Sequence, residues 1–160
     1  MDFTSLLWRR APTRCAELAG VTLFSGLTPA ELAVVRNLLH LREYVADEVV
    51  FDQGETGHAL YLVLAGEVSI RDPMNSRGAD LARLGPGEFF GELGLLDEST
   101  RTAQVRALRD CRLAILFRED FTDLMDSHLR IAHKIGRQLL RHLGERLRLA
   151  ALCAGEHRHS

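Results

Sequence analysis

The stretch GPGEFFGELGLLDESTRTA, residues 85–103, decides the fold of this chain of 160 residues. It reads as an apolar strand end at Phe89–Phe90, a glycine, a short helical segment, and an arginine that leads into a new strand. Gly91 has no Cβ, so another group can approach its backbone closely or its φ angle can be unusual. A short helix beginning near Glu92 would direct unpaired N–H groups and a partial positive charge at a group in front of it. The stretch therefore predicts a site for a small anion.

Two side chains of this stretch narrow the chemistry of the ligand. Arg101 can present a planar fork of donors, which fits phosphate oxygens in a bidentate manner. Glu92 is an unfavourable neighbour for an anion unless the ligand also offers hydroxyl donors beside its phosphate. A cyclic nucleotide meets both conditions, because its ribose 2′-OH lies next to a cyclic phosphate. By residue type alone, Arg101 could equally be a surface arginine and Glu92 an acid in the first turn of a helix.

The order of residues across this stretch resembles a known family. Gly-Glu-Leu-Gly-Leu at 91–95, a short spacer and Arg-Thr-Ala at 101–103 are similar to the phosphate-binding cassette of the cyclic nucleotide-binding domain family. That family includes the bacterial catabolite activator protein, the regulatory subunits of cyclic AMP-dependent kinase and cyclic nucleotide-gated channels. Further similar stretches lie at residues 23–27, 54–55 and 61–68. The resemblance covers roughly residues 20 to 150.

The resemblance implies roles for the residues of the cassette. Arg101 is expected to pair with the cyclic phosphate, and Glu92 to accept a hydrogen bond from the ribose 2′-OH. Ala103 is expected to donate its backbone N–H to the phosphate. Gly91 and Leu93 match the cassette on either side of the glutamate. The expected ligand is cyclic AMP or cyclic GMP.

Recognition of the base is less determined by the sequence. The Thr102 hydroxyl can bond the phosphate or a guanine amino group, so this residue does not settle which base is preferred. Cyclic AMP is the first expectation, and cyclic GMP stays open. Ile70 and Leu81 are predicted to face inward and form an apolar wall, a position that ordinary core residues also occupy. The resemblance, taken without gaps, implies that Arg146 and Leu147 stand where the catabolite activator protein has a threonine and a serine that contact adenine. The guanidinium of Arg146 could cap the base, or Arg146 could be a solvated helix arginine.

Short apolar runs separated by Gly, Pro and Asn predict an α+β, mainly β fold, an antiparallel β jelly roll or small barrel. The predicted strands are Val49–Phe51, Leu60–Leu64, Val68–Ile70, Leu81–Leu84, Phe89–Phe90, Val105–Ala107 and Cys111–Phe117, with another near Val45. Helices are expected at residues 13–20, from Pro29 to about residue 39 behind a Thr28 cap, and at residues 118–126. The expected divisions are an N-terminal arm at 1–11, the β-roll with flanking helices at 12–127, a long helix at 128–153 and a tail at 154–160.

The long C-terminal helix carries apolar residues close to a heptad spacing. They are Ala132, Ile135, Leu139, Leu143, Leu147 and Ala150. This pattern favours a parallel homodimer seam, and the alternative is packing of the helix on its own barrel. The helix is also expected to act as a lid over the nucleotide.

Composition excludes several classes of function. Three cysteines (Cys15, Cys111 and Cys153) lack C-x-x-C or Cys/His spacing, so no metal is expected. A metal-dependent cupin enzyme would need paired histidines on one strand, and His58 has none two residues away. No Ser-His-Asp or paired-carboxylate arrangement is legible, so an enzyme is not expected.

Location and partners follow from what the sequence lacks. It shows no signal peptide and no run of about 20 apolar residues, so a cytoplasmic protein without a membrane span is expected. Residues 128–160 carry a net charge of +5 against −2 for the whole chain. Without a helix-turn-helix segment, however, no direct sequence-specific DNA binding is expected. The predicted role is a sensor that acts through an unidentified effector protein, or a domain of a longer chain. The alternative is a structural dimer or interaction module that has lost its ligand.

Overall fold

The computed structural model describes residues 14–74 and 79–156 of the chain. Its helices are α1 (Cys15–Ala19), the 3₁₀ helix η2 (Thr22–Phe24), α2 (Pro29–Arg36), α3 (Leu93–Leu96), α4 (Arg118–Ser127) and α5 (Leu129–Glu156). Its strands are β1 (His40–Tyr44), β2 (Val49–Phe51), β3 (Ala59–Ala65), β4 (Val68–Arg71), β5 (Asp80–Leu84), β6 (Phe89–Phe90), β7 (Gln104–Ala107) and β8 (Cys111–Phe117). The predicted arm at residues 1–11 lies outside the described residues.

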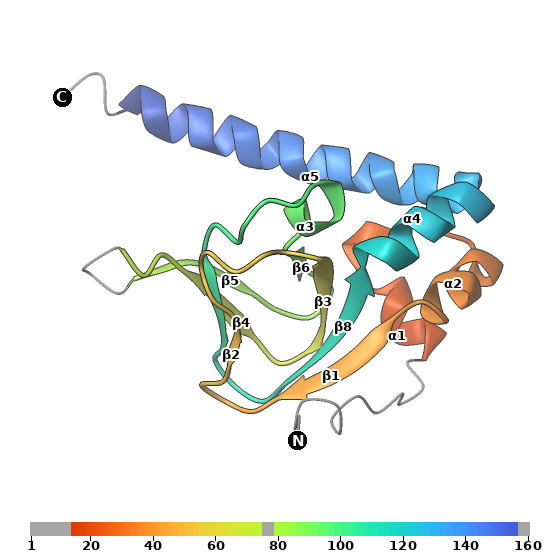
Figure 1. Cartoon of the computed structure of the whole chain (residues 1–160), viewed down its shortest axis with the longest axis horizontal. Coiled ribbons are helices and arrows are strands. Elements are labelled where there is room, and N and C mark those ends of the chain that lie inside the picture. The colour runs from red at the N-terminus through yellow and green to blue at the C-terminus, as the bar shows by residue number, and fades with distance from the viewer. Residues whose placement is uncertain (1–13, 75–78, 157–160) are drawn as a thin grey trace.

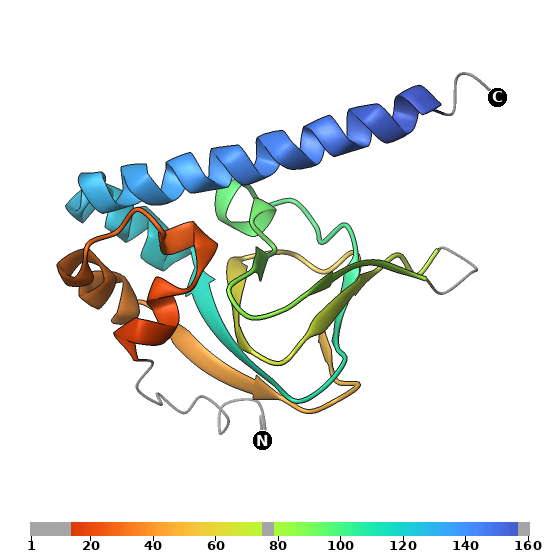
Figure 2. The same cartoon turned by 180° about the vertical axis from the view of Figure 1, so that it is seen from behind.

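The strands form two four-stranded sheets with the orders β1-β8-β3-β6 and β2-β7-β4-β5. Neighbouring strands pair antiparallel throughout both sheets. Figure 1 shows α1, α2 and α4 gathered at one end of this β-roll, with α5 lying across it; Figure 2 shows the same arrangement from behind. The predicted α+β, mainly β jelly roll with N-terminal helices and a C-terminal helix pair is confirmed.

The strand β3 contributes side chains to both apolar clusters of the domain. Successive side chains of a strand point to opposite faces. Leu60 and Leu62 therefore join the cluster between the roll and the helices, while Val63 and the partly buried Tyr61 face the cluster inside the roll. This is why β3 is apolar along its length, in contrast to a strand with one solvated face.

The N-terminal elements follow local sequence signals, with two boundary differences. Thr28 Oγ1 accepts from the Glu31 backbone N–H at 3.3 Å and the Glu31 carboxylate accepts from the Thr28 N–H at 2.8 Å, so the predicted capping box is present. The helix ends at Arg36 rather than near residue 39, because Asn37 caps it and β1 begins at His40. The strand predicted near Val45 is β1, but it ends at Tyr44, so Val45 lies just beyond it and is 65% exposed.

The predicted heptad seam of α5 has two parts that differ in burial. Ile131, Ile135 and Leu139 are buried in the cluster that also contains residues of α1, α2 and α4. Each fully buried aliphatic side chain stabilises this docking by about 1.5–3 kcal/mol. Leu147, by contrast, is 70% exposed. The first part of α5 therefore packs on its own domain, as the alternative interpretation expected, and the second part leaves Leu147, Leu149 and Leu152 exposed.

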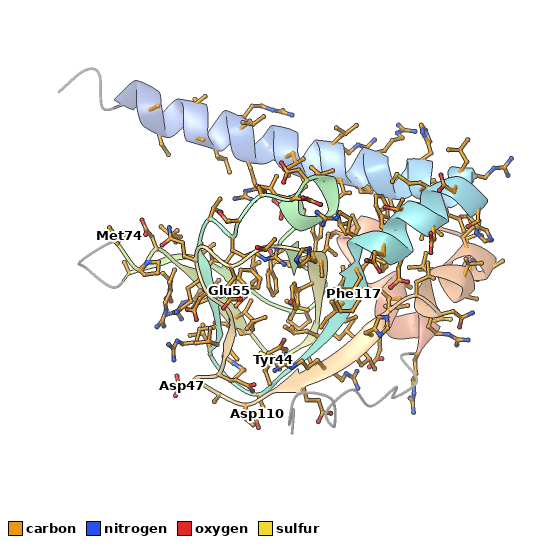
Figure 3. All side chains as sticks on the ribbon, in the orientation of Figure 1. Tyr44, Asp47, Glu55, Met74, Asp110 and Phe117 are labelled. Atoms are coloured by element: carbon orange, nitrogen blue, oxygen red, sulfur yellow. The ribbon has the colours of Figure 1, made fainter. Side chains whose placement is uncertain are left out.

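The end of α5 and the β4–β5 hairpin extend beyond the roll. The helix runs to Glu156, so it includes residues that were expected to form the tail from 154. Met74 lies at the outer end of the hairpin and is 84% exposed (Figure 3). None of the helices that the structure describes combines the length and apolar character needed to cross a membrane.

Candidate functional site

A cavity of about 430 Å³ lies between β4, β5, β7, the segment around α3, and α5. Every residue that the sequence assigned to ligand binding lines it. These residues are Ile70, Leu81, Gly91, Glu92, Leu93, Arg101, Thr102, Ala103 and Arg146. The structure thus brings together, around one space, side chains that come from four separate parts of the chain.

Glycines make room for the guanidinium of Arg101. A Cβ on Gly91 would lie 2.7 Å from Nη1, and one on Gly57 would lie 3.0 Å from Nε and Cζ. A Cβ on Gly94 would lie 3.1 Å from Nη1. Gly91 also has φ +75°, a left-handed conformation that residues with a side chain rarely adopt. These glycines form a socket in which the arginine side chain is held.

Carbonyl oxygens and aromatic rings fix Arg101 inside this socket. Its Nη1 donates to Gly91 O at 3.1 Å and its Nη2 to Ala59 O at 2.8 Å. Its Cζ lies 4.2 Å from the centre of the Phe51 ring and 5.7 Å from that of Tyr61. Arg101 is 9% exposed, and burial lowers the pKa of its guanidinium below the ordinary value. Burial removes the water that would otherwise solvate this cation. The negative charge of an anion in the cavity would compensate for that loss.

The loop that carries Arg101 is anchored to the β2–β3 loop by backbone hydrogen bonds. The Arg101 N–H donates to Glu55 O at 2.7 Å, and the Gly54 N–H donates to Arg101 O at 2.8 Å. Gln53 Nε2 donates to Thr102 O at 3.1 Å. Glu55, which Figure 3 labels, lies between β2 and β3. The anchoring holds Arg101, Thr102 and Ala103 at the wall of the cavity before any ligand contact is made.

Glu92 is a nearly inaccessible carboxylate at the same wall. It directly precedes α3 and is 2% exposed. Its Oε1 accepts a hydrogen bond from Arg146 Nη1, and His142 Nε2 lies 3.9 Å from the same oxygen. Both residues come from α5, and Arg146 brings a positive charge to the buried carboxylate. Arg146 thus reaches the cavity at the glutamate and is not simply a solvated helix arginine.

His142 is a site residue that the sequence analysis missed. Its ring centre lies 4.4 Å from that of Phe89, and both residues line the cavity. His142 and Arg146 are four positions apart, so they share one face of α5. That spacing is the signal that could have found the histidine once Arg146 had been assigned to the site.

The apolar walls agree with the sequence at Ile70 but differ at Leu81. Ile70 is partly buried and packs against the cluster inside the roll. Leu81 was expected to face inward; it lines the cavity but is 58% exposed, because β5 is at the edge of its sheet. Further apolar lining residues were not assigned to the site from sequence: Phe51, Ala82, Leu84, Phe89, Phe90 and Val105.

A second cavity of about 410 Å³ shares Leu84, Phe89 and His142 with the first. Its polar lining includes Glu88, Arg141 and Glu145.

Across residues 14–74 and 79–156, no group of three or more His, Cys, Asp or Glu side chains is arranged to hold a metal ion. His58, the histidine weighed above for a cupin-type site, has its Nδ1 3.1 Å from Nη2 of Arg118.

Comparison with known proteins gives consistent similarities. The family model of the cyclic nucleotide-binding domain matches residues 41–128. The cyclic AMP receptor protein of Thermus thermophilus is 40% identical over 129 residues, which are 80% of this chain and 60% of that protein. The chain thus spans at most about three-fifths of the length of the curated relatives it matches first.

Solved structures show the same fold. The crystal structure of Thermus thermophilus catabolite activator protein has a TM-score of 0.77 and 38% identity, covering 86% of this chain and 63% of that one. The regulatory domain of Toxoplasma gondii PKA, crystallised with cAMP, has a TM-score of 0.61 and 28% identity, covering 68% of this chain and 42% of that one. Together with the site described above, these matches lead to one conclusion: the chain belongs to the cyclic nucleotide-binding domain family.

Proposed function

We propose that the chain is a cyclic nucleotide-binding regulatory domain whose first ligand is cyclic AMP. The observation that carries this proposal is the placement of a buried arginine and a buried glutamate at one cavity wall. Arg101 supplies a fork of donors for a phosphate, and Glu92 supplies an acceptor for a ribose hydroxyl. The names of the similar proteins, a cyclic AMP receptor and a kinase regulatory domain crystallised with cAMP, support the choice of ligand.

In this proposal the nucleotide lies along the cavity from the cassette to α5. The phosphate meets Arg101 and the backbone N–H of Ala103, and the Thr102 hydroxyl can add a further bond. The base lies between the apolar wall at Ile70 and Leu81 and the underside of α5. Cyclic GMP would fit the same space, so the Thr102 hydroxyl is the group that could favour it.

Signalling would pass through the C-terminal helices. α5 reaches the cavity with His142 and Arg146, and it packs on α4, which directly follows β8. A ligand can shift a helix only by binding one arrangement better than another. Hydrogen exchange of residues 135–150, measured with and without saturating cyclic AMP, tests this step. Equal exchange would mean that α5 is a scaffold and that the signal leaves by another route.

We also propose a homodimer through the uncovered part of α5, which would present its surface to an unidentified effector protein. Leu140 and Leu147 are 71% and 70% exposed and lie seven residues apart, the spacing of one stripe of a coiled coil. Leu143 lies between them on the same side and is only partly buried. A second copy of this helix would cover all three side chains.

Calorimetric titration with cyclic AMP and cyclic GMP tests the proposed ligand. We expect saturable binding of cyclic AMP and weaker binding of cyclic GMP. The matched control is Arg101→Ala, in which the cavity remains but the phosphate partner is gone. A wild-type chain that binds neither nucleotide would instead be a structural or interaction module of the same fold.

A further inference from the structure

The contact between Glu92 and α5 carries an inference about how the helix is held. Glu92 is 2% exposed, whereas the Arg146 side chain that pairs with it is 58% exposed. A buried carboxylate is costly unless it is paired and hydrogen-bonded. The pairing here comes from a residue 54 positions away in the chain. Docking of α5 therefore brings to Glu92 a compensating charge that the cassette itself does not place in hydrogen-bond contact with it.

The position of this contact along α5 shows what it holds. The buried residues of the helix end at Leu139, and Leu140 is 71% exposed. Beyond that point, the described contacts of α5 with the roll include those that His142 and Arg146 make with Phe89 and Glu92. The second part of α5 thus has the ion pair with Glu92 and the ring contact with Phe89 at the cavity, where the first part has fully buried aliphatic side chains.

The two oxygens of Glu92 have different surroundings. The hydrogen bond from Arg146 and the approach of His142 both involve Oε1. A carboxylate has acceptor sites on both oxygens. Oε2 is therefore the oxygen available to a hydroxyl in the cavity, and a ribose need not displace Arg146 in order to bind.

We propose that Arg146, assisted by His142, is a positioning residue with two roles. Its contact with Glu92, called the clasp below, docks the second part of α5 without nucleotide. The same contact orients Oε2 of Glu92 toward the ribose. The ribose part rests on the proposed function. Since the clasp and the ribose use different oxygens of one carboxylate, the two interactions do not compete, and the clasp favours ribose binding by fixing the orientation of that carboxylate. If formation of the clasp raises the affinity for the ribose by some factor, then binding of the ribose raises the equilibrium constant for forming the clasp by the same factor.

The clasp is tested first without nucleotide. Arg146→Met keeps the apolar stem and removes the charge, and Glu92→Gln removes the carboxylate. We expect each change to speed hydrogen exchange in residues 140–152, and the double variant to exchange no faster than the faster single variant. Arg148→Met is the matched control, since Arg148 is exposed and its Nε lies 3.4 Å from Gly144 O of the same helix. Unchanged exchange in Arg146→Met would overturn the clasp.

A melting experiment separates the clasp from a general loss of packing. Arg146→Met leaves a buried carboxylate with weaker compensation, so its Tm should fall. Adding Glu92→Gln should recover part of that loss, because an uncharged amide is less costly to bury. His142→Phe keeps an aromatic ring against Phe89 and should lower the Tm less than Arg146→Met. A double variant that melts below both single variants would contradict the pairing.

The ribose part is tested by comparing cyclic AMP with 2′-deoxy cyclic AMP. A hydrogen bond to a charged acceptor predicts that wild type prefers the 2′-hydroxyl by roughly 10- to 100-fold. Arg146→Met should reduce this preference to a few-fold, and Arg148→Met should keep it. If wild type shows the preference and Arg146→Met retains it, the positioning role is wrong while the proposed function stands. If wild type binds neither nucleotide, the proposed function fails and the exchange experiment still decides the clasp.

Discussion

At the scale of the residue, Arg101 is where the sequence and the structure meet most closely. The socket around it consists of glycines because a Cβ at Gly57, Gly91 or Gly94 would lie 3.1 Å or less from its side chain. Two backbone carbonyls and two aromatic rings then fix the direction of the guanidinium. Such preorganisation lowers the cost of ordering a side chain when a ligand binds.

We predict that Arg101→Ala weakens cyclic AMP binding by about 2–5 kcal/mol, the usual cost of truncating one partner of a buried charge pair. Arg101→Lys should recover only part of this loss, because a point charge does not replace the planar fork. Calorimetric titration measures both. Arg109→Ala is the control, because that side chain is 69% exposed. Equal affinity in wild type and Arg101→Ala would remove Arg101 from the site.

A second prediction concerns Gly91. Gly91→Ala would place a Cβ 2.7 Å from Arg101 Nη1 at a residue with φ +75°. We expect the free energy of unfolding in urea to fall by about 1–3 kcal/mol, the cost of such backbone strain, and nucleotide binding to weaken with it. Gly85→Ala is the matched control in the same stretch, since nothing lies within 4 Å of its Cβ position. Equal stabilities of the two variants would show that the socket tolerates a side chain.

At the scale of the element, α5 is anchored to α2 as well as to the roll. Lys134 Nζ donates to both carboxylate oxygens of Glu31, at 2.8 and 3.1 Å. These bonds from Lys134, together with the Thr28 N–H, hold the pKa of Glu31 below its ordinary value of 4.5. The same glutamate therefore caps the start of α2 and receives the only lysine of the chain.

This pair predicts a pH dependence of stability. A carboxyl whose pKa is lowered by folding contributes stability above its unfolded pKa and loses it as the pH falls through the folded value. We expect the free energy of unfolding to drop as the pH falls below about 4.5, and to drop less steeply in Lys134→Met. Urea denaturation across this range measures the slopes, with exposed Arg137→Met as the control. Parallel slopes in wild type and Lys134→Met would exclude the pair as a cause.

At the scale of the whole molecule, α5 serves two surfaces in succession. Its first part completes the core between the roll and the helices, and its second part carries leucines that a partner helix could cover. Removing α5 altogether would therefore remove core residues together with the proposed dimer surface. Single substitutions in the two parts separate these roles.

We predict opposite outcomes for Ile135→Ala and Leu147→Ala. Ile135 is fully buried, so its truncation should lower the free energy of unfolding by about 2–5 kcal/mol. Leu147 is 70% exposed, so its truncation should change the stability of the monomer by no more than about 0.5 kcal/mol. Leu147→Ala should instead weaken the dimer in sedimentation velocity experiments. A wild-type chain that sediments as a monomer at high concentration would rule out the proposed dimer.

The sequence by itself determined the β-roll, the cassette and part of the lining of the cavity, but not His142, Phe51 or Val105. These features depend on local causes: the alternation of apolar residues along strands, the Thr28–Glu31 capping box, and the order of glycines, glutamate and arginine in residues 91–103. Each cause acts over a few residues, so it can be recognised before the chain is folded.

The tertiary structure alone decided how α5 is used and what surrounds Glu92. A heptad pattern states that one face of a helix is apolar, but it does not state which surface covers that face. Packing of α5 against α4, η2 and the roll placed Ile135 and Leu139 in the core and left Leu147 exposed. The pairing of Glu92 with Arg146 has the same origin, because two charges 54 residues apart meet only when the long helix crosses the cavity.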